Sequence, residues 1–417
     1  MPQVIYLRLP VIMTALLVIN FAVISALMAW SAGRAIGTGG IAGAFAAAAC
    51  ITILDWANYT IVPFWGTAQS LARSWSAYPS LILFQSLTGM PGTVFLVASL
   101  SALVAVFAGC RTKRWRVIAA ACAVLLAAVT INICIGMQKP VGFITVAAIG
   151  WPYPPDGPRA DEAGGFESLF AGPIAKAAAS GACLIVTPEA GLAVASDTRQ
   201  RIFGVLSNLA EANRVWLVAG YIDYELEENR LAVFSPEGRA ELTYSKTHVI
   251  PWLEPWNKGT GAVAATRMDD IWLGGMICND DNFTDISRRH SREGTQVMAV
   301  PTLDWQRVST AHLSNSLHRP IESGYAIVRA TAGGISVIAD ARGRVLARMN
   351  HITEGPGYIV AEIPVYRGGT FYGTAGNWMV WAAAIYAAVY LIVRTAGRRK
   401  SPSGGSHQLD RRADKAM

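Results

Sequence analysis

The chain has 417 residues, of which 53% are hydrophobic and only 15% are charged. This composition argues against a wholly soluble globular protein. The net charge of +7 arises from basic clusters in segments 111–116 and 394–417, which flank long apolar stretches. Lys and Arg in such places are retained on the cytoplasmic side of a membrane, so the charge indicates topology. No basic stripe remains that would bind a nucleic acid.

Five stretches lack charge over a length that suits a transmembrane helix, which needs about 20 apolar residues. They are segments 9–33, 35–54, 93–110, 117–138 and 368–393. The first has no small-x-small cleavage site before Arg34, which favours a span over a signal peptide. By the positive-inside rule the two basic clusters are cytoplasmic, which makes the block between the fourth and fifth spans extracytoplasmic.

The sequence thus divides into four parts. We predict a membrane region over 1–138, a catalytic domain over 139–367, a transmembrane helix over 368–394 and a basic cytoplasmic tail over 395–417. Within the first part, segment 55–92 is rich in Trp, Tyr, Pro and Ser. Such a segment suits the membrane–water boundary, and a loop packed on the soluble domain is an equally good interpretation.

The middle block alternates between two kinds of pattern. Strand-like runs occupy 142–149, 183–187, 215–221, 230–235, 241–245, 271–278, 296–300, 326–331, 334–339 and 344–349. Helix-like stretches occupy 166–180, 196–213, 285–293 and 309–323. The alternation predicts an α/β domain in which helices cover one or more sheets.

The cysteine and histidine patterns indicate no metal and no cofactor. The six cysteines form no CxxC pair and no disulfide framework. The six histidines are scattered, and His312 and His318 lack both the i, i+4 spacing and a nearby Cys pair that a zinc site would use.

Three strand-like runs end close to residues that can carry chemistry. They deliver Glu189, then Lys246 with Glu254, then Cys278, and the carboxyl ends of strands are where ligands gather in α/β folds. A carboxylate can take a thiol proton, an ammonium can stabilise the thiolate and the oxyanion, and the thiolate is a nucleophile. The backbone N–H of Asn279 would complete an oxyanion hole. Together these groups suffice for acyl transfer through a thioester.

Each residue also has a plainer interpretation when it is taken singly. A Cys at the end of an apolar strand is more often an inert core residue, as we expect for Cys183. Glu189 would serve as a helix cap, and Lys246 as a surface charge. The order of the three residues and their flanking sequence favour the catalytic interpretation.

The three segments resemble, in order, the Glu, Lys and Cys motifs of the nitrilase (carbon-nitrogen hydrolase) superfamily. Segments 144–148, 319–324 and 330–336 are also similar to that family. Apolar spans on both sides of the domain make the order of parts similar to apolipoprotein N-acyltransferases, as do segment 85–96 and the Lys-x-His-x-x-Pro-x-x-Glu pattern of residues 246–254.

This resemblance implies an α-β-β-α sandwich flanked by transmembrane helices in a bacterial cytoplasmic (inner) membrane. It implies that Cys278 takes an acyl chain from a phospholipid and passes it to the N-terminal amine of a lipoprotein. Glu189 would be general base and then acid, and Lys246 the oxyanion stabiliser. The supporting or substrate-binding residues would be Glu254, Asn279, Asp280, Asp304 and Trp305.

The sequence departs from the acyltransferase pattern, which keeps alternatives open. It has about three fewer front spans than the family usually has. Cys278-Asn279-Asp280 stands where the family prefers Cys-Tyr-Glu, and segment 302–305 stands where it has Asn-Asp-x-Trp. A second interpretation is a membrane-tethered amidase, in which water resolves the thioester formed by the same triad. A third is an inactive membrane scaffold.

Overall fold

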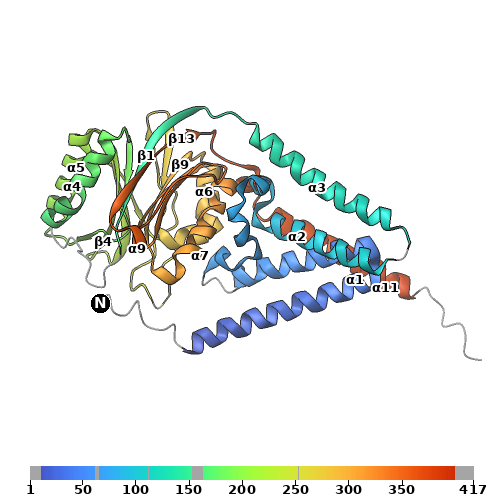
Figure 1. Cartoon of the computed structure of the whole chain (residues 1–417). Helices are drawn as coiled ribbons and strands as arrows, with labels where there is room; N and C mark the ends of the chain where they lie inside the picture. Colours follow the sequence, from blue (N-terminus) through green and yellow to red (C-terminus); the bar gives the residue numbers. More distant parts are fainter. Residues whose placement is uncertain (1–10, 62–64, 111, 153–162, 252, 400–417) are drawn as a thin grey trace, which may run out of the picture.

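The computed structural model describes residues 11–61, 65–110, 112–152, 163–251 and 253–399 (Figure 1). The start of the first predicted span and the basic tail from residue 400 onward lie outside these ranges.

Two sheets form the centre of the catalytic domain. The order of the first is β13-β1-β2-β4-β5-β6, with β3 paired to β4, and the order of the second is β12-β11-β10-β9-β8-β7. The first sheet comprises β1 (Gly142–Gly150), β2 (Leu184–Val186), β3 (Leu192–Val194), β4 (Trp216–Asp223), β5 (Glu228–Phe234), β6 (Ala240–Ser245) and β13 (Gly357–Val365). The second comprises β7 (Ala265–Met268), β8 (Ile271–Gly275), β9 (Val297–Leu303), β10 (Ala326–Ala332), β11 (Ile335–Ala339) and β12 (Val345–Asn350).

Helices cover the outer face of each sheet. On the first sheet lie α4 (Ala163–Ala179) and α5 (Arg199–Asn213), and on the second lie α6 (Thr284–Arg292), α7 (Gln306–Ser316) and α8 (His318–Ser323) (Figure 1). In β1, Ala147 and Ile149 point to the α4/α5 core, whereas Val146 and Ala148 point to the core between the sheets. Both faces of this strand are therefore apolar, as its unbroken hydrophobic run requires. The predicted α-β-β-α sandwich is confirmed.

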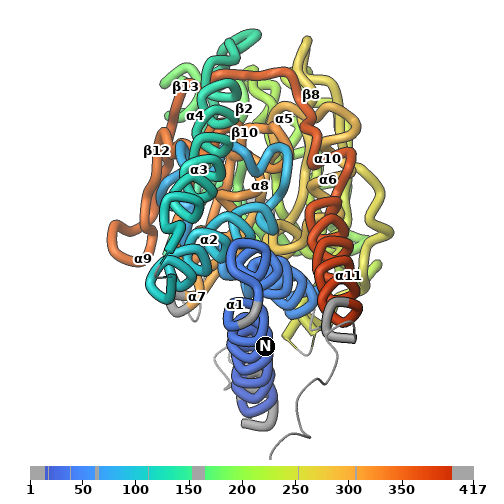
Figure 2. Tube along the Cα trace, turned by 90° about the vertical axis from the view of Figure 1, so that its right-hand side faces the viewer, coloured from blue at the N-terminus to red at the C-terminus, as the bar shows by residue number. Residues whose placement is uncertain are grey.

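Five helical segments within the described ranges are long and apolar enough to cross a membrane. They belong to α1 (Val11–Ile61), α2 (Gln85–Gly109), α3 (Arg114–Gly136) and α11 (Trp378–Arg399), and they gather on one side of the sandwich (Figure 2). Two of the five lie in α1, which reverses direction at Gly40, where φ is +55°. Its two halves lie side by side, because Asn20 Nδ2 donates a 2.6 Å hydrogen bond to Asn58 Oδ1.

The connection between the second and third spans is shorter than the predicted segment 55–92, because α1 ends at Ile61 and α2 begins at Gln85. Helix α1 continues to Ile61, and its buried Asp55 carboxylate accepts hydrogen bonds from the Ser70 hydroxyl (2.7 Å) and the Leu71 N–H (2.9 Å). These bonds compensate the burial of the Asp55 carboxylate. The predicted span 35–54 ended just before this residue. Between the helices lie three short 3₁₀ turns, η2 (Gly66–Gln69), η3 (Leu71–Ala77) and η4 (Pro79–Leu81).

Several elements of the catalytic domain also differ from expectation. Strands β3, β7 and β13 were not predicted, nor was the short helix α9 (His351–Glu354). Beyond the domain, the predicted fifth span 368–393 begins too early, because the short helix α10 (Phe371–Ala375) precedes the membrane-length helix α11, which starts at Trp378. The single helix predicted over 309–323 is two helices that meet at Leu317, because Pro320 lacks the N–H needed to continue the first one. Strand β8 ends at Gly275, so Cys278 opens the 3₁₀ turn η5 (Cys278–Asn282) instead of ending a strand.

Candidate active site

Glu189 and Lys246 meet in the interior of the catalytic domain. Glu189 lies three residues after β2, and Lys246 directly follows β6. Lys246 Nζ lies 2.7 Å from Glu189 Oε1 and 2.6 Å from Glu254 Oε1. Asn229 donates a further hydrogen bond of 2.6 Å to Glu189 Oε1. One ammonium is thus shared between two carboxylates.

The charges in this cluster depend on each other. Burial acts to lower the pKa of Lys246, but the charges of Glu189 and Glu254 outweigh it and hold that pKa well above its ordinary value. Burial raises the pKa of Glu254 in spite of the opposing charge of Lys246. Lys246 therefore stays an ammonium throughout the physiological pH range, in contact with the residue that the sequence identified as the base.

Cys278 occupies a strained turn beside this cluster. Its φ of +45° is rare for a residue with a side chain, and such strain concentrates at functional sites. Its Sγ lies 3.6 Å from the Leu303 carbonyl oxygen, and the N–H of Leu303 donates a 2.6 Å hydrogen bond to Glu189 Oε2. Leu303 therefore connects the thiol to the acid. Burial and the charge of Glu189 raise the pKa of Cys278 well above its ordinary value, while Lys246 opposes this shift.

Asp280 joins the turn that carries Cys278 to the loop that carries Lys246. Its Oδ2 accepts a hydrogen bond from the Tyr244 hydroxyl (2.8 Å), and its Oδ1 accepts one from the His248 N–H (2.7 Å). The Ile277 N–H, next to the nucleophile, also donates to Oδ2 at 3.1 Å. Asp280 is fully buried, so these donors compensate its charge and fix the distance between two segments of the site.

A second ion-pair network lies on the other side of Cys278. Asp304 contacts His312 Nδ1 at 2.7 Å and Arg329 at 2.8 Å, and His312 Nε2 lies 2.8 Å from Asp281. Burial acts to raise the pKa of Asp304, but the charges of Arg329 and His312 lower it to about 2. Burial acts to lower the pKa of His312, but Asp281 and Asp304 raise it to about 9. The network thus joins two carboxyl groups, an imidazole and a guanidinium in the interior of the protein.

One group of side chains has the donor types of a metal site. In the described part of the chain, ligand atoms of Cys278, Asp304 and His312 lie within 4.8 Å of one another. However, both ring nitrogens of His312 already contact carboxylates. A protonated imidazole has no lone pair for a metal, so the arrangement fits an ion-pair network.

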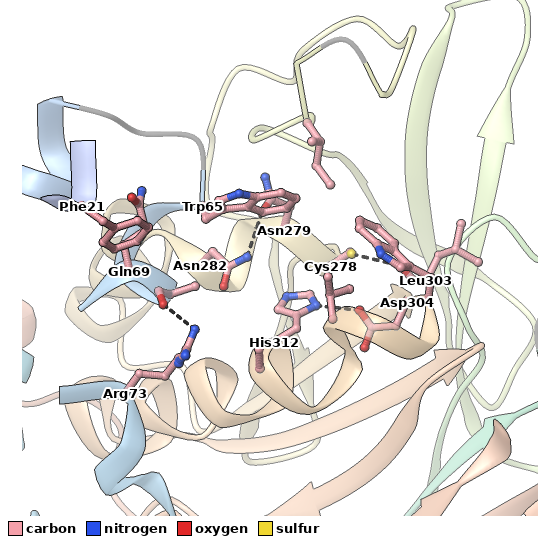
Figure 3. Close-up of a pocket in the computed structure, with 15 residues that line it drawn as sticks. Phe21, Trp65, Gln69, Arg73, Cys278, Asn279, Asn282, Leu303, Asp304 and His312 are labelled. Atoms are coloured by element: carbon pink, nitrogen blue, oxygen red, sulfur yellow. Dashed lines mark hydrogen bonds and ion pairs between the residues drawn. The ribbon is translucent and has the colours of Figure 1, made fainter. Parts of the chain in front are cut away.

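A cavity of about 250 Å³ gives access to Cys278. Its wall is built from the catalytic domain, the 65–73 segment and the first half of α1 (Figure 3). The residues that line it include Phe21, Trp65, Gln69, Arg73, Ile250, Cys278, Asn279, Asn282, Asp304, Trp305 and His312. Although the Cys278 side chain is buried, it faces this space and is accessible from it.

The sequence profile of the carbon-nitrogen hydrolase family matches residues 145–370, which is more than half of the chain. The chain belongs to the carbon-nitrogen hydrolase family.

The relatives of this family member include apolipoprotein N-acyltransferases. An apolipoprotein N-acyltransferase of Geobacter metallireducens is 28% identical over 255 residues, which cover 54% of this chain and 48% of that protein. One from Neisseria meningitidis serogroup B is 25% identical over 245 residues, covering 51% and 48%. The chain spans about half the length of the curated relatives it matches. Among solved structures, a mutant nitrilase-superfamily amidase from Nesterenkonia AN1 is 20% identical, with a TM-score of 0.48, covering 53% of this chain and 90% of the amidase.

The structure of this carbon-nitrogen hydrolase family member places the candidate residues in two groups. Glu189, Lys246 and Glu254 form the buried ion cluster, and Cys278, Asn279, Asp304 and Trp305 line the cavity. Asp280 is not among the residues that line the cavity, and its hydrogen bonds connect the loops that carry Lys246 and Cys278. His312 and Asn229 were not singled out for roles in the site. A His at the eighth position after Asp304 was visible in the sequence, but only the course of α7 brings it back to that carboxylate.

Proposed function

We propose that this protein is a membrane acyltransferase of the apolipoprotein N-acyltransferase type. Cys278 would form a thioester with an acyl chain from a phospholipid and transfer that chain to the N-terminal amine of a lipoprotein. The observation that supports this most is the cavity beside Cys278, because Phe21 of an apolar, membrane-length helix forms part of its wall. A lipid chain can therefore approach the thiol without crossing water.

In the first half-reaction, Glu189 takes the proton of the Cys278 thiol as Sγ attacks the ester carbonyl. Lys246 and the backbone N–H of Asn279 stabilise the negative charge on the carbonyl oxygen. The bond between the acyl carbon and the glycerol oxygen then breaks, and Glu189 returns the proton to the leaving lysophospholipid. A raised thiol pKa suits this sequence, because the proton leaves only during the attack.

In the second half-reaction, the acceptor amine attacks the thioester carbonyl and Glu189 takes one amine proton. The C–S bond breaks, an amide bond forms, and the proton passes back to Cys278. Glu254 keeps Lys246 charged, and Asp280 holds the loops in register. Asp304 and Trp305 shape the pocket that receives the acyl group.

The alternative function is a membrane-tethered carbon-nitrogen hydrolase, in which water attacks the same thioester. One observation favours it: polar side chains of Gln69, Asn279 and Asn282 line the cavity, and such groups can order a water molecule. The triad cannot separate the two reactions, because both form the same acyl-enzyme.

Intact mass spectrometry tests the shared first step. Full-length protein purified in detergent and incubated with phospholipid should gain the mass of one acyl chain. The Cys278→Ser variant should gain none under the same conditions. An adduct of equal yield on that variant would exclude Cys278 as the acylated residue.

A diacylated lipopeptide then separates the two reactions. When it is added to the acylated enzyme, a triacylated product supports the transferase. Release of free fatty acid without that product supports a hydrolase, as does release of ammonia from an amide substrate.

We also propose that the protein is a multi-pass protein of the bacterial inner membrane with its catalytic domain on the outer, periplasmic side. The basic cluster 111–116 between α2 and α3 supports this orientation. A reporter fused after Lys400 should be cytoplasmic, and one inserted near Gly157 should be extracytoplasmic. The reverse pattern would contradict the proposal.

A further inference from the structure

Arg73 is a cation in the wall of the cavity whose charge no carboxylate of the described chain neutralises. It lies in the 3₁₀ turn η3, is partly buried, and is among the residues that line the cavity. The one hydrogen bond that its guanidinium makes among the described residues runs from Nη1 to the Ala68 carbonyl oxygen, at 2.7 Å. A guanidinium has five N–H donors, so most of its capacity is available to a ligand.

The other buried arginines of the described chain use their charge within the protein. Arg319 pairs with Glu322 at 2.8 Å, and Arg329 pairs with Asp304 at the same distance. The buried Arg342 has no acid partner, but its two terminal nitrogens donate to backbone carbonyl oxygens and its guanidinium lies over the Tyr366 ring. Arg73 differs from all three because it lines a cavity and donates one side-chain hydrogen bond, so an anion in that cavity can supply the missing charge.

The position of Arg73 in the cavity indicates which part of a ligand it would contact. Figure 3 shows Arg73 and Phe21 toward one end of the site, and Cys278 and Asp304 toward the other. A ligand that places a carbonyl carbon at Cys278 would therefore place a group several bonds away at Arg73. In a glycerophospholipid, the glycerol unit separates the acyl carbonyl from the phosphate in this way.

We propose that Arg73 binds the phosphate of the acyl donor and so selects phospholipids over neutral glycerolipids. This inference rests on the proposed function, because it assumes that the cavity receives the acyl donor. The guanidinium fork matches the oxygen pair of a phosphate, and its weak hydration suits the membrane boundary. Phe21 and Trp65 would contact the apolar part of the same lipid.

A binding assay without chemistry tests this proposal. A diether phosphatidylglycerol has no ester to attack, so it occupies the cavity without acylating the enzyme. Occupancy is measured as protection of Cys278 from N-ethylmaleimide, located by peptide mass spectrometry because the described chain has other free cysteines. We expect protection of the wild-type protein by the diether phospholipid and little protection by the matching diether glycerol.

The Arg73→Gln variant should need about 10- to 100-fold more diether phospholipid for half-protection, the range expected when a hydrogen bond to a charged group is lost. Its weak protection by the diether glycerol should not change. Arg267→Gln is the matched control, because Arg267 is exposed on β7, outside the cavity lining. It should behave as wild type. Equal protection of the wild type and Arg73→Gln by the phospholipid would overturn the proposal.

Two further arms identify the source of the phosphate and separate this proposal from the proposed function. Protection by millimolar inorganic phosphate that disappears in Arg73→Gln would identify a free-phosphate site and overturn the assignment to a lipid. No protection by free phosphate supports the lipid headgroup. If the acyl adduct never forms on Cys278 but the Arg73-dependent protection is observed, the proposed transfer fails and the phosphate site stands.

Discussion

The two walls of the cavity differ in how firmly they are held. On the catalytic side, Asp304 and His312 are buried and bonded to fixed partners. On the membrane side, the Phe21 side chain is 45% exposed, and large apolar side chains along the first half of α1 are exposed too. The hydrogen bond between Asn20 and Asn58 joins the two halves of α1.

This difference indicates that the two walls of the cavity have different roles. The reacting groups are preorganised by charge and hydrogen bonds, which is what transition-state stabilisation requires. The opposite wall presents apolar surface that suits contact with lipid, and it imposes little geometry of its own. Substitutions on the catalytic side should therefore affect both stability and rate, whereas substitutions on the membrane side should affect only the use of lipid donors.

The largest effect should follow from Lys246→Met, which leaves Glu189 and Glu254 buried without their cation. We expect a loss of about 4 kcal/mol in the free energy of unfolding, typical of one partner removed from a buried ion pair. The rate of acyl-adduct formation should fall about 1,000-fold, the upper end for loss of an oxyanion donor. Denaturation in detergent and timed mass spectrometry provide the two measurements.

A second variant separates the two losses. Lys246→Met combined with Glu254→Gln removes one of the two stranded carboxylates, so it should regain part of the stability and none of the rate. Recovery of the rate in this double variant would show that Lys246 acts only on folding.

His312 should give the next largest effect, and that effect should depend on pH. The folded-state pKa of about 9 lies above the ordinary value of 6.5, so its stabilisation is fully present below pH 6.5 and is lost as pH rises through 9. His312→Gln should therefore cost up to about 3 kcal/mol near pH 6 and progressively less toward high pH. The groups that face His312 are Asp281, Asp304 and Arg329.

Thermal unfolding of the wild type and His312→Gln across this pH range is the measurement. In a charge-balanced variant, His312→Gln with Asp281→Asn, the free energy of unfolding should depend less on pH across this range. If the difference between the wild type and His312→Gln stays constant from pH 6.5 to above 9, His312 is not a buried cation.

Substitution of Asp280 should have a smaller effect, on both the stability and the rate of adduct formation. Asp280→Asn keeps the shape of the side chain but turns one acceptor oxygen into a donor, which then faces the donors Tyr244 or His248. We expect a loss of about 2 kcal/mol in stability and a drop of about tenfold in adduct formation. Asp285→Asn is the matched control, because the Asp285 side chain is 45% exposed and its Oδ1 lies 3.3 Å from Nε2 of the partly exposed His248. An equal effect of the two substitutions would contradict a positioning role for Asp280.

Features of this chain that depend on local sequence could be predicted, whereas those that depend on contacts between distant residues could not. Glu189, Lys246 and Cys278 were singled out because each closely follows a strand-like run, and a run is a local signal. Strand β13 was missed because its ends are marked by Gly357 and Pro364, and only pairing with β1, more than 200 residues earlier, makes it a strand.

The site shows the same limit. The roles of His312 and Arg73 depend on contacts made by the folded chain: α7 returns His312 to Asp304, and the 65–73 segment brings Arg73 to the cavity. The two predicted spans 9–33 and 35–54 imply a reversal at Arg34, whereas α1 reverses six residues later, at Gly40. This position was hidden, because a glycine inside an apolar run is also common in straight membrane helices. The grouping of candidate residues near strand ends was therefore predictable, and the cavity wall formed by α1 and the 65–73 segment was not.

The membrane-side wall should give the smallest effect. Phe21→Ala should change the free energy of unfolding by less than about 0.5 kcal/mol, because a half-exposed side chain loses little burial. Acylation by phospholipid should slow a few-fold, since truncation removes apolar contact with the donor. Acylation by a short, water-soluble ester should not change, because such a donor needs no apolar wall. Val23→Ala is the control, as Val23 is 51% exposed on the same helix but does not line the cavity. If Phe21→Ala slows acylation by both donors equally, Phe21 acts on the geometry of Cys278. The membrane-side wall would then affect the reacting groups as well as the lipid donor, contrary to what the packing of the two walls indicates.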